Sequence, residues 1–126
     1  MSRHAFKSSF APAPDGAFSA GVTYGSLIAV SAQLPVDAEG ALVEGGAAEQ
    51  AGAALENLRR QLTSIGLSFD HIVSLHVCLV DEADTTAVDA AIAAAFAEPY
   101  PARTIVGVAW VPGDARLQIG ALAARH

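Results

Sequence analysis

The chain has 126 residues, 52% hydrophobic and 16% charged, a composition that predicts a single folded domain over residues 1–126. Seven Lys and Arg against thirteen Asp and Glu give a net charge of −6, so no basic surface is available for a nucleic-acid backbone. No apolar run approaches the roughly 20 residues of a membrane span, and the polar start argues against a signal peptide. We therefore expect a cytoplasmic protein that binds neither nucleic acid nor membranes.

Turn residues and hydrophobic periodicity divide the chain into strands and two helices. The first part predicts an irregular arm or edge segment (1–20, with 1–12 a flexible arm), two strands turning at Gly25-Ser26 (21–33), a loop (35–46) and a helix that begins near Ala47 and stops at Gly66. The second part predicts a strand (71–80), a helix from Asp84 or Thr85 to Pro99, a strand (101–110), a turn (112–114) and a final strand (116–124).

This order of elements predicts an α+β fold in which both helices pack on one face of a mixed sheet. The strand over 71–80 is apolar at most positions and is expected to be buried on both faces. An apolar second face and a low charge content together favour a homo-oligomer that covers this face with other subunits.

The sequence contains no dinucleotide-binding, phosphate-binding or zinc-protease motif. Two of the four histidines lie near the chain ends, and His71 and His76, five residues apart on one predicted strand, point to opposite faces. We therefore expect no metal site. Cys78 is the single cysteine, so no intramolecular disulfide can form, and on an apolar strand it is expected to serve packing.

Arg103 stands at the start of an apolar, strand-like run rich in Val and Ile. A guanidinium is always protonated and requires an anion wherever water is scarce, and its planar fork suits a carboxylate. Two partners are open from the residues alone. One is a carboxylate of the protein, on Glu98 or on a neighbouring subunit, and the other is the carboxylate of a ligand.

Three segments resemble the RidA (YjgF-type) family of enamine/imine deaminases: 30–35 (Val-Ser-Ala-Gln-Leu-Pro), 55–58 (Leu-Glu-Asn-Leu) and 101–104 (Pro-Ala-Arg-Thr). The resemblance extends from about Pro12 to Ala123. It implies a chorismate-mutase-like fold and a homotrimer with ligand clefts between subunits. It also implies hydrolysis of 2-enamine and 2-imine acids to 2-keto acids and ammonia without metal or cofactor. In this scheme Arg103 clamps the substrate carboxylate, and backbone groups near Ala32 and Thr104 order water.

The chain departs from the family pattern at several positions around the reacting carbon. Gly120 occupies the position at which the family often has the glutamate that positions water. Asp89 occupies the position of a common asparagine. Phe18 replaces a tyrosine, Ile105 a cysteine and Ala32 a glycine. Gln118, on the same strand face as Gly120, and Asp89 are the candidate substitutes for the missing glutamate. The predicted catalytic residues are Arg103, Gln118 and Asp89, and the predicted substrate-binding residues are Arg103, Thr104, Ile105, Phe18, Ser31, Ala32 and Gly120.

Two other functions stay open at this point. The chain could form a trimer that binds small carboxylates or metabolites without hydrolysing them, or a biosynthetic enzyme that acts on a bulkier substrate in the same cleft. Some relatives in this family carry a ribonuclease or translation-inhibitor label. The net charge of −6 and the lack of a basic face argue against that activity here.

Overall fold

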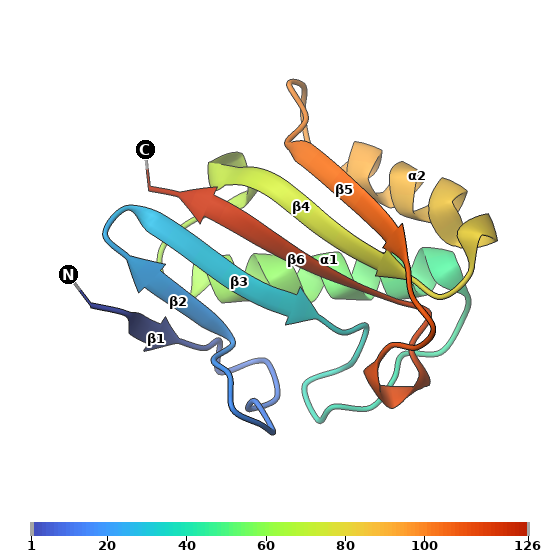
Figure 1. Cartoon of the computed structure of the whole chain (residues 1–126), viewed down its shortest axis with the longest axis horizontal. Coiled ribbons are helices and arrows are strands. Elements are labelled where there is room, and N and C mark those ends of the chain that lie inside the picture. Colours follow the sequence, from blue (N-terminus) through green and yellow to red (C-terminus); the bar gives the residue numbers. More distant parts are fainter. Residues whose placement is uncertain (1, 126) are drawn as a thin grey trace.

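The computed structural model describes residues 2–125 as one six-stranded mixed sheet with two helices on one face (Figure 1). The strand order is β1-β2-β3-β6-β4-β5, antiparallel throughout except for the parallel pair β4–β5. This confirms the predicted mixed sheet with two helices. The elements are β1 (His4–Phe6), β2 (Gly21–Tyr24), β3 (Leu27–Gln33), α1 (Ala47–Thr63), β4 (Ile72–Leu79), α2 (Thr85–Ala95), β5 (Ala102–Gly107) and β6 (Leu117–Ala124), with 3-10 turns at Phe69–His71, Glu82–Asp84 and Pro112–Asp114.

Local interactions at both ends of α1 account for where this helix begins and ends. At its start the Gly46 N–H donates to Oε1 of Glu49 at 2.8 Å, which satisfies one of the free amides of the first turn. At its end Gly66 adopts a φ of +75°, a conformation that glycine reaches without strain, and its N–H donates to the carbonyl of Thr63. The apolar stripe of α1 is buried against the sheet, and Ile65, just beyond the helix, is partly buried.

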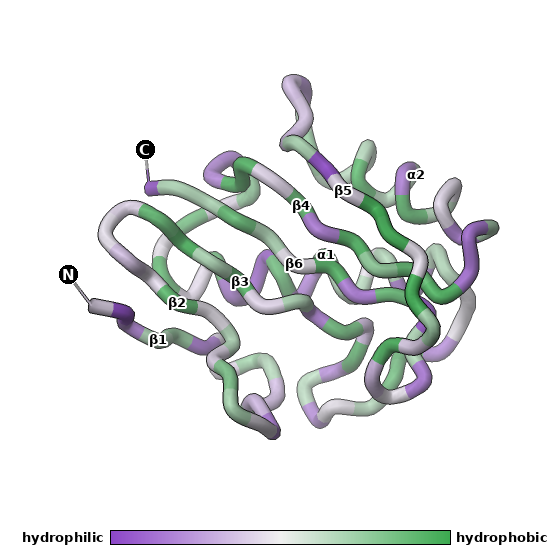
Figure 2. Tube along the Cα trace, in the orientation of Figure 1, coloured by the Kyte–Doolittle hydropathy of each residue, from purple (hydrophilic) through white to green (hydrophobic). Residues whose placement is uncertain are grey.

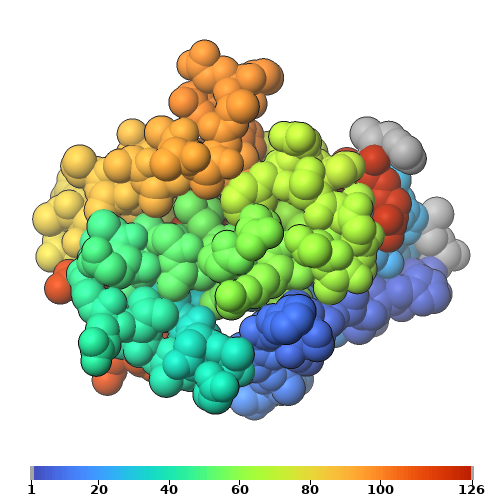
Figure 3. All heavy atoms as spheres, turned by 180° about the vertical axis from the view of Figure 1, so that it is seen from behind, coloured from blue at the N-terminus to red at the C-terminus, as the bar shows by residue number. Residues whose placement is uncertain are grey.

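The core lies between the helices and one face of the sheet, and the helices cover that face in the view from behind (Figure 3). It includes Leu58 and Leu62 of α1, Val88 of α2, Leu75 of β4 and Ile119 of β6, each fully or almost fully buried. Burying side chains of this size contributes about 1.5–3 kcal/mol each. Neither helix within residues 2–125 is long and apolar enough to cross a membrane.

The opposite face of the sheet, here called the open face, has no cover within this chain. On β4 the burial alternates: Leu75 and Val77 are buried, whereas His76 is exposed. The expectation that this strand is buried on both faces is therefore wrong for the single chain. Leu27, Val106 and Leu122 are 49%, 47% and 37% exposed, and pairing and alternation assign all three to the open face. The hydropathy colouring marks the central strands as largely apolar (Figure 2).

Part of the N-terminal segment (1–20), which was expected to form an irregular arm or edge, packs against the rest of the molecule. Strand β1 pairs with β2 and adds an outer strand to the sheet. Beyond it, Ser8 is buried, and its N–H donates to Oε1 of Gln61 on α1 at 2.8 Å. The N-terminal segment therefore lies against both layers of the fold.

A β-bulge in β3 lies against Gly120 of β6. Val30 pairs with Ala121 and Gln33 with Ile119, so Ser31 and Ala32 together face the single residue Gly120. A Cβ on Gly120 would lie 3.2 Å from the Ala32 nitrogen and 3.3 Å from both the Ala32 Cα and the Val30 carbonyl oxygen. The bulge thus leaves little space for any side chain at position 120.

This close contact predicts that Gly120→Ala lowers the free energy of unfolding by about 1–3 kcal/mol, because backbone must move to admit one methyl group. Gly52→Ala is the matched control. Gly52 is an exposed position of α1, and apart from the helix's own backbone no atom lies within 4 Å of its Cβ position. Alanine there should therefore add about 0.5–1 kcal/mol to the free energy of unfolding. Chemical denaturation of both variants measures the two changes. A Gly120→Ala variant that is as stable as wild type, or more stable, would refute the packing argument.

Candidate functional site

Arg103 lies near the start of the edge strand β5, on the face that carries the helices. Its neighbour on that face, Ile105, packs against the core, whereas Thr104 lies on the open face. The chain reaches β5 through α2, which packs beside it, and Asp89 projects from α2 toward the strand. The Nη1 of Arg103 donates to Oδ1 of Asp89 at 2.7 Å. The carboxylate that pairs with Arg103 is thus Asp89 and not Glu98, which was one of the expected partners.

The Arg103–Asp89 pair lines a hollow of about 420 Å³ between α2 and the start of β5. We call it the clamp hollow; its residues are Asp89, Ile92, Ala93, Tyr100, Pro101 and Arg103. Apolar side chains form part of the wall, and Tyr100 adds an exposed phenol. One cation, one anion and one phenol on an apolar wall suit a small polar molecule rather than a large apolar one.

The strength of the Arg103–Asp89 pair decides whether a ligand can compete for Arg103. The two side chains are 33% and 64% exposed. Ion pairs this exposed contribute about 0–1 kcal/mol to stability, whereas a charge-assisted, two-point contact with a ligand carboxylate contributes about 1.5–3 kcal/mol. A ligand carboxylate can therefore bind Arg103 beside Asp89 or in its place.

Gln118 and Gly120 share one face of β6, as alternation predicted, and the structure shows that this is the open face. They line a second hollow, here called the open-face hollow, together with Ala29, Val30, Ala32, His76, Cys78, Ala121 and Leu122. Arg103 lies on the other side of the sheet. Within one chain, neither Gln118 nor Gly120 can share a small ligand with Arg103.

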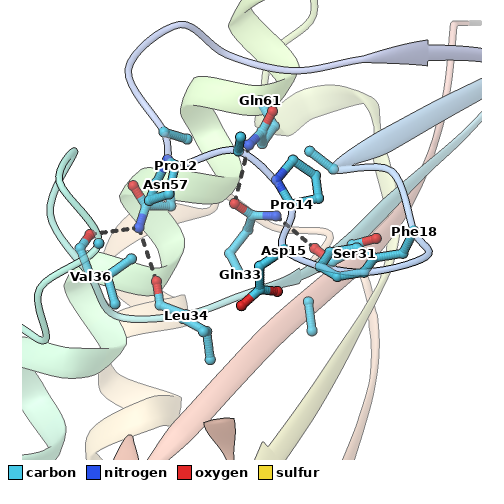
Figure 4. A pocket seen from close by; sticks show the side chains of 15 residues that line it. Pro12, Pro14, Asp15, Phe18, Ser31, Gln33, Leu34, Val36, Asn57 and Gln61 are labelled. Atoms are coloured by element: carbon cyan, nitrogen blue, oxygen red, sulfur yellow. Dashed lines mark hydrogen bonds between the residues drawn. The ribbon is translucent and has the colours of Figure 1, made fainter. Parts of the chain in front are cut away.

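Phe18 and Ser31 belong to a third hollow, here called the glutamine hollow, which lies between α1, β3 and the loop that precedes β2 (Figure 4). Several of its polar side chains already form hydrogen bonds within the chain. Gln61 Nε2 donates to Gln33 Oε1 at 3.4 Å, Gln33 Nε2 donates to the Ser31 carbonyl at 2.8 Å, and Ser31 Oγ donates to the Ser19 carbonyl at 2.7 Å. Ala32 lines both this hollow and the open-face hollow.

The predicted site residues thus form three groups in the single chain. The first group is Arg103 and Asp89, which contact each other. The second is Gln118, Gly120 and Ala32, which lie on the opposite side of the sheet from Arg103. The third is Phe18 and Ser31, which line the hollow beside the loop before β2. The family segment around Asn57 serves the fold: its Nδ2 donates to the carbonyls of Leu34 and Val36, both at 2.9 Å.

Sequence reasoning missed two residues that share these hollows with predicted ones. Tyr100 lies in the clamp hollow, and its position three residues before Arg103 was the available signal. His76 lies opposite Gly120 in the β4–β6 register and lines the open-face hollow, with its Nε2 3.2 Å from Oγ of Ser74. Only the pairing of β4 with β6, which the sequence did not predict, brings His76 there. His71 lies in the turn before β4, where its Nδ1 accepts the Ser68 N–H.

A second group of cations lies on the solvent side of α1, beside a hollow of about 540 Å³. Here Arg59 and Arg60 share the carboxylate of Glu56, whose hydrogen bond and negative charge raise the pKa of the Arg59 guanidinium. Such pairs within one exposed helix are common and weak. Within residues 2–125 there is no group of three or more His, Cys, Asp or Glu side chains placed to hold a metal ion.

Comparison with known proteins gives a consistent family assignment. Residues 8–125 match the family described as Endoribonuclease L-PSP. The chain is 36% identical over 119 residues to the 2-iminobutanoate/2-iminopropanoate deaminase of Salmonella typhimurium, covering 92% of this chain and 93% of that protein. It also matches RidA from the Antarctic bacterium Psychrobacter (TM-score 0.91, 31% identity, 96% and 98% coverage) and Escherichia coli TdcF with bound serine (TM-score 0.91, 31% identity, 98% and 99% coverage).

The match spans nearly the whole chain in both sequence and structure, and it includes the segments on which the resemblance was based. The chain therefore belongs to the Endoribonuclease L-PSP family, also known as the RidA or YjgF family.

Proposed function

We propose that this protein hydrolyses small 2-imino acids, and the 2-enamine acids in equilibrium with them, to 2-keto acids and ammonia. The observation that carries the proposal is Arg103 at the clamp hollow, a cation on strand β5 next to a space for a small molecule. The relative named as a 2-iminobutanoate/2-iminopropanoate deaminase supports the reaction, and the serine bound to TdcF supports a small acid as ligand.

In this proposal the guanidinium of Arg103 binds the substrate carboxylate and fixes the position of C2. The water oxygen forms a bond to C2 of the iminium group, and one water proton moves to the nitrogen. The C2–N bond then breaks as the C2=O bond forms, and the nitrogen leaves with the second proton as ammonium. Orientation of reactants by binding is itself a large source of rate enhancement, which suits a chain with Gly120 in place of the family glutamate.

The proposed assembly is a homotrimer with clefts between subunits. Two observations support it: the open face exposes Leu27, Val106 and Leu122, and the predicted site residues are divided between opposite faces of the sheet. A second copy that covers the open face of the first would bring the two groups into one cleft. In that cleft Thr104, Gln118 and the bulge at Ala32 would supply polar groups that order water, while Phe18 and Ile105 would supply apolar contacts.

A trimer predicts a mass in solution of about 38 kDa, three times the chain mass of 12.8 kDa. Val106→Glu places a charge on the apolar open face and should shift the protein toward the monomer. Leu42→Glu, at an exposed position outside the strands of the sheet, is the control and should leave the mass unchanged. Light scattering coupled to gel filtration measures all three proteins. A wild-type mass of one chain would contradict the proposed assembly.

The clamp role predicts that Arg103→Ala lowers kcat/KM for 2-iminopropanoate by roughly 10- to 150-fold, the equivalent of losing a charge-assisted contact worth about 1.5–3 kcal/mol. Arg103→Lys should recover only part of this loss, because a lysine keeps the charge but not the planar fork. Pyruvate release is measured while a serine dehydratase generates the substrate in place, against a reaction without added protein. Arg59→Ala removes another exposed arginine and serves as the control. Unchanged turnover by Arg103→Ala would refute the proposal.

Gly120 favours a second candidate function, binding of small carboxylates without hydrolysis, because loss of a general acid or base costs about 10²–10⁴-fold in rate. This alternative predicts that wild type binds pyruvate but does not accelerate the formation of pyruvate from 2-iminopropanoate in the same assay. Acceleration by wild type that depends on Arg103 would exclude it.

A further inference from the structure

The clamp hollow contains both signs of charge side by side. The Arg103 guanidinium and the Asp89 carboxylate touch at 2.7 Å, and both side chains line the same space. We propose that Arg103 and Asp89 together bind ligands that carry a carboxylate and a cationic nitrogen on adjacent carbons, with Asp89 binding the nitrogen. This proposal rests on the proposed function, since it assigns the substrate class of the same site.

The free hydrogen-bonding capacity of the pair allows such a ligand to bind both residues. Arg103 uses one N–H for Asp89, and a guanidinium has five. Asp89 accepts through Oδ1, and a carboxylate can accept through both oxygens. Within residues 2–125 neither side chain has another hydrogen-bonded partner. A ligand carboxylate can therefore bind the remaining guanidinium N–H groups while an ammonium or iminium N–H binds the second oxygen of Asp89.

The backbone of the two residues belongs to packed elements, although both side chains are partly or largely exposed. Asp89 follows Val88, which is fully buried, and precedes Ile92 of the core by less than one helical turn. Arg103 is held by the pairing of β5 with β4, in which it lies opposite Leu75. The two residues of the site thus belong to α2 and β5, which are both packed in the fold. Only the exposed ends of the side chains need to move to admit a ligand.

The pair distinguishes the proposed substrate from its product. The iminium form of a 2-imino acid offers a carboxylate to Arg103 and a cationic N–H to Asp89. Hydrolysis replaces the nitrogen with a carbonyl oxygen, so the 2-keto acid offers nothing to Asp89, and its own negative charge lies close to that carboxylate. Asp89 therefore favours binding of the substrate and release of the product, a preference that a neutral side chain at this position would not produce.

L-Alanine and pyruvate test the proposal, because they share a three-carbon carboxylate and differ in the group on C2. Their dissociation constants are measured by NMR titration or calorimetry for wild type, Asp89→Asn, Arg103→Ala and Glu98→Gln. Glu98→Gln removes the same charge from an exposed position five residues before Arg103. Thermal unfolding confirms that each variant is folded.

We expect wild type to bind alanine more tightly than pyruvate. Asp89→Asn should reduce this preference about 10-fold or more, by weakening alanine and strengthening pyruvate, a change equivalent to one charge-assisted contact. Glu98→Gln should leave the preference as it is. Tighter binding of pyruvate by wild type, no binding of alanine, or an unchanged preference in Asp89→Asn would overturn the proposal.

The same measurements separate this proposal from the proposed function. Arg103→Ala should weaken both ligands, because both carry the carboxylate. If it does so and Asp89→Asn leaves the preference unchanged, the arginine clamp stands and the role of Asp89 fails. If Arg103→Ala weakens neither ligand, the clamp itself fails, and the proposed function fails with it.

Discussion

The parallel pairing of β5 with β4 determines where the Arg103–Asp89 pair and its hollow lie. Two parallel neighbours cannot be joined by a tight turn, so the chain crosses over the sheet through a helix before it returns. That helix is α2, and its apolar side packs into the core through Val88 and Ile92. The packing of this crossover next to the edge strand brings Asp89 to Arg103, although fourteen residues separate them in the chain. The charge pair and its hollow are thus a consequence of the crossover.

A second constraint is that the helices cover only one face of the sheet. Because strand side chains alternate, successive residues of β5 and β6 point in turn to the core side and to the open face. Arg103 and Ile105 lie on one side, and Thr104, Gln118 and Gly120 lie on the other. A single layer of sheet therefore separates Arg103, the proposed carboxylate-binding group, from the residues expected around the reacting carbon. The proposed association of copies resolves both this division and the exposure of apolar side chains on the open face.

Local features of the fold could be predicted from sequence, because they depend on nearby residues. The turn at Gly25-Ser26 and the helix end at Gly66 both follow from glycine next to a change of periodicity, and the structure confirms them. Features that depend on strand pairing could not be predicted. The bulge that faces Gly120, the position of His76 opposite it and the choice of Asp89 as partner of Arg103 all follow from which elements are neighbours in space.

The bulge and the charge pair together suggest how a member of this family could work with Gly120. A Cβ at position 120 would lie 3.2 Å from the Ala32 nitrogen, so the bulge of β3 leaves little space beside β6 at this position. The charged groups at the clamp hollow are Arg103 and Asp89, and in our proposal they bind the two charges of an iminium acid rather than the attacking water. An iminium carbon is already a strong electrophile. Binding that favours the cationic form therefore raises the concentration of the reactive species in the site, and it does so without a protein group to remove a proton from water. On this reasoning the chain relies on selecting the charged substrate and orienting it.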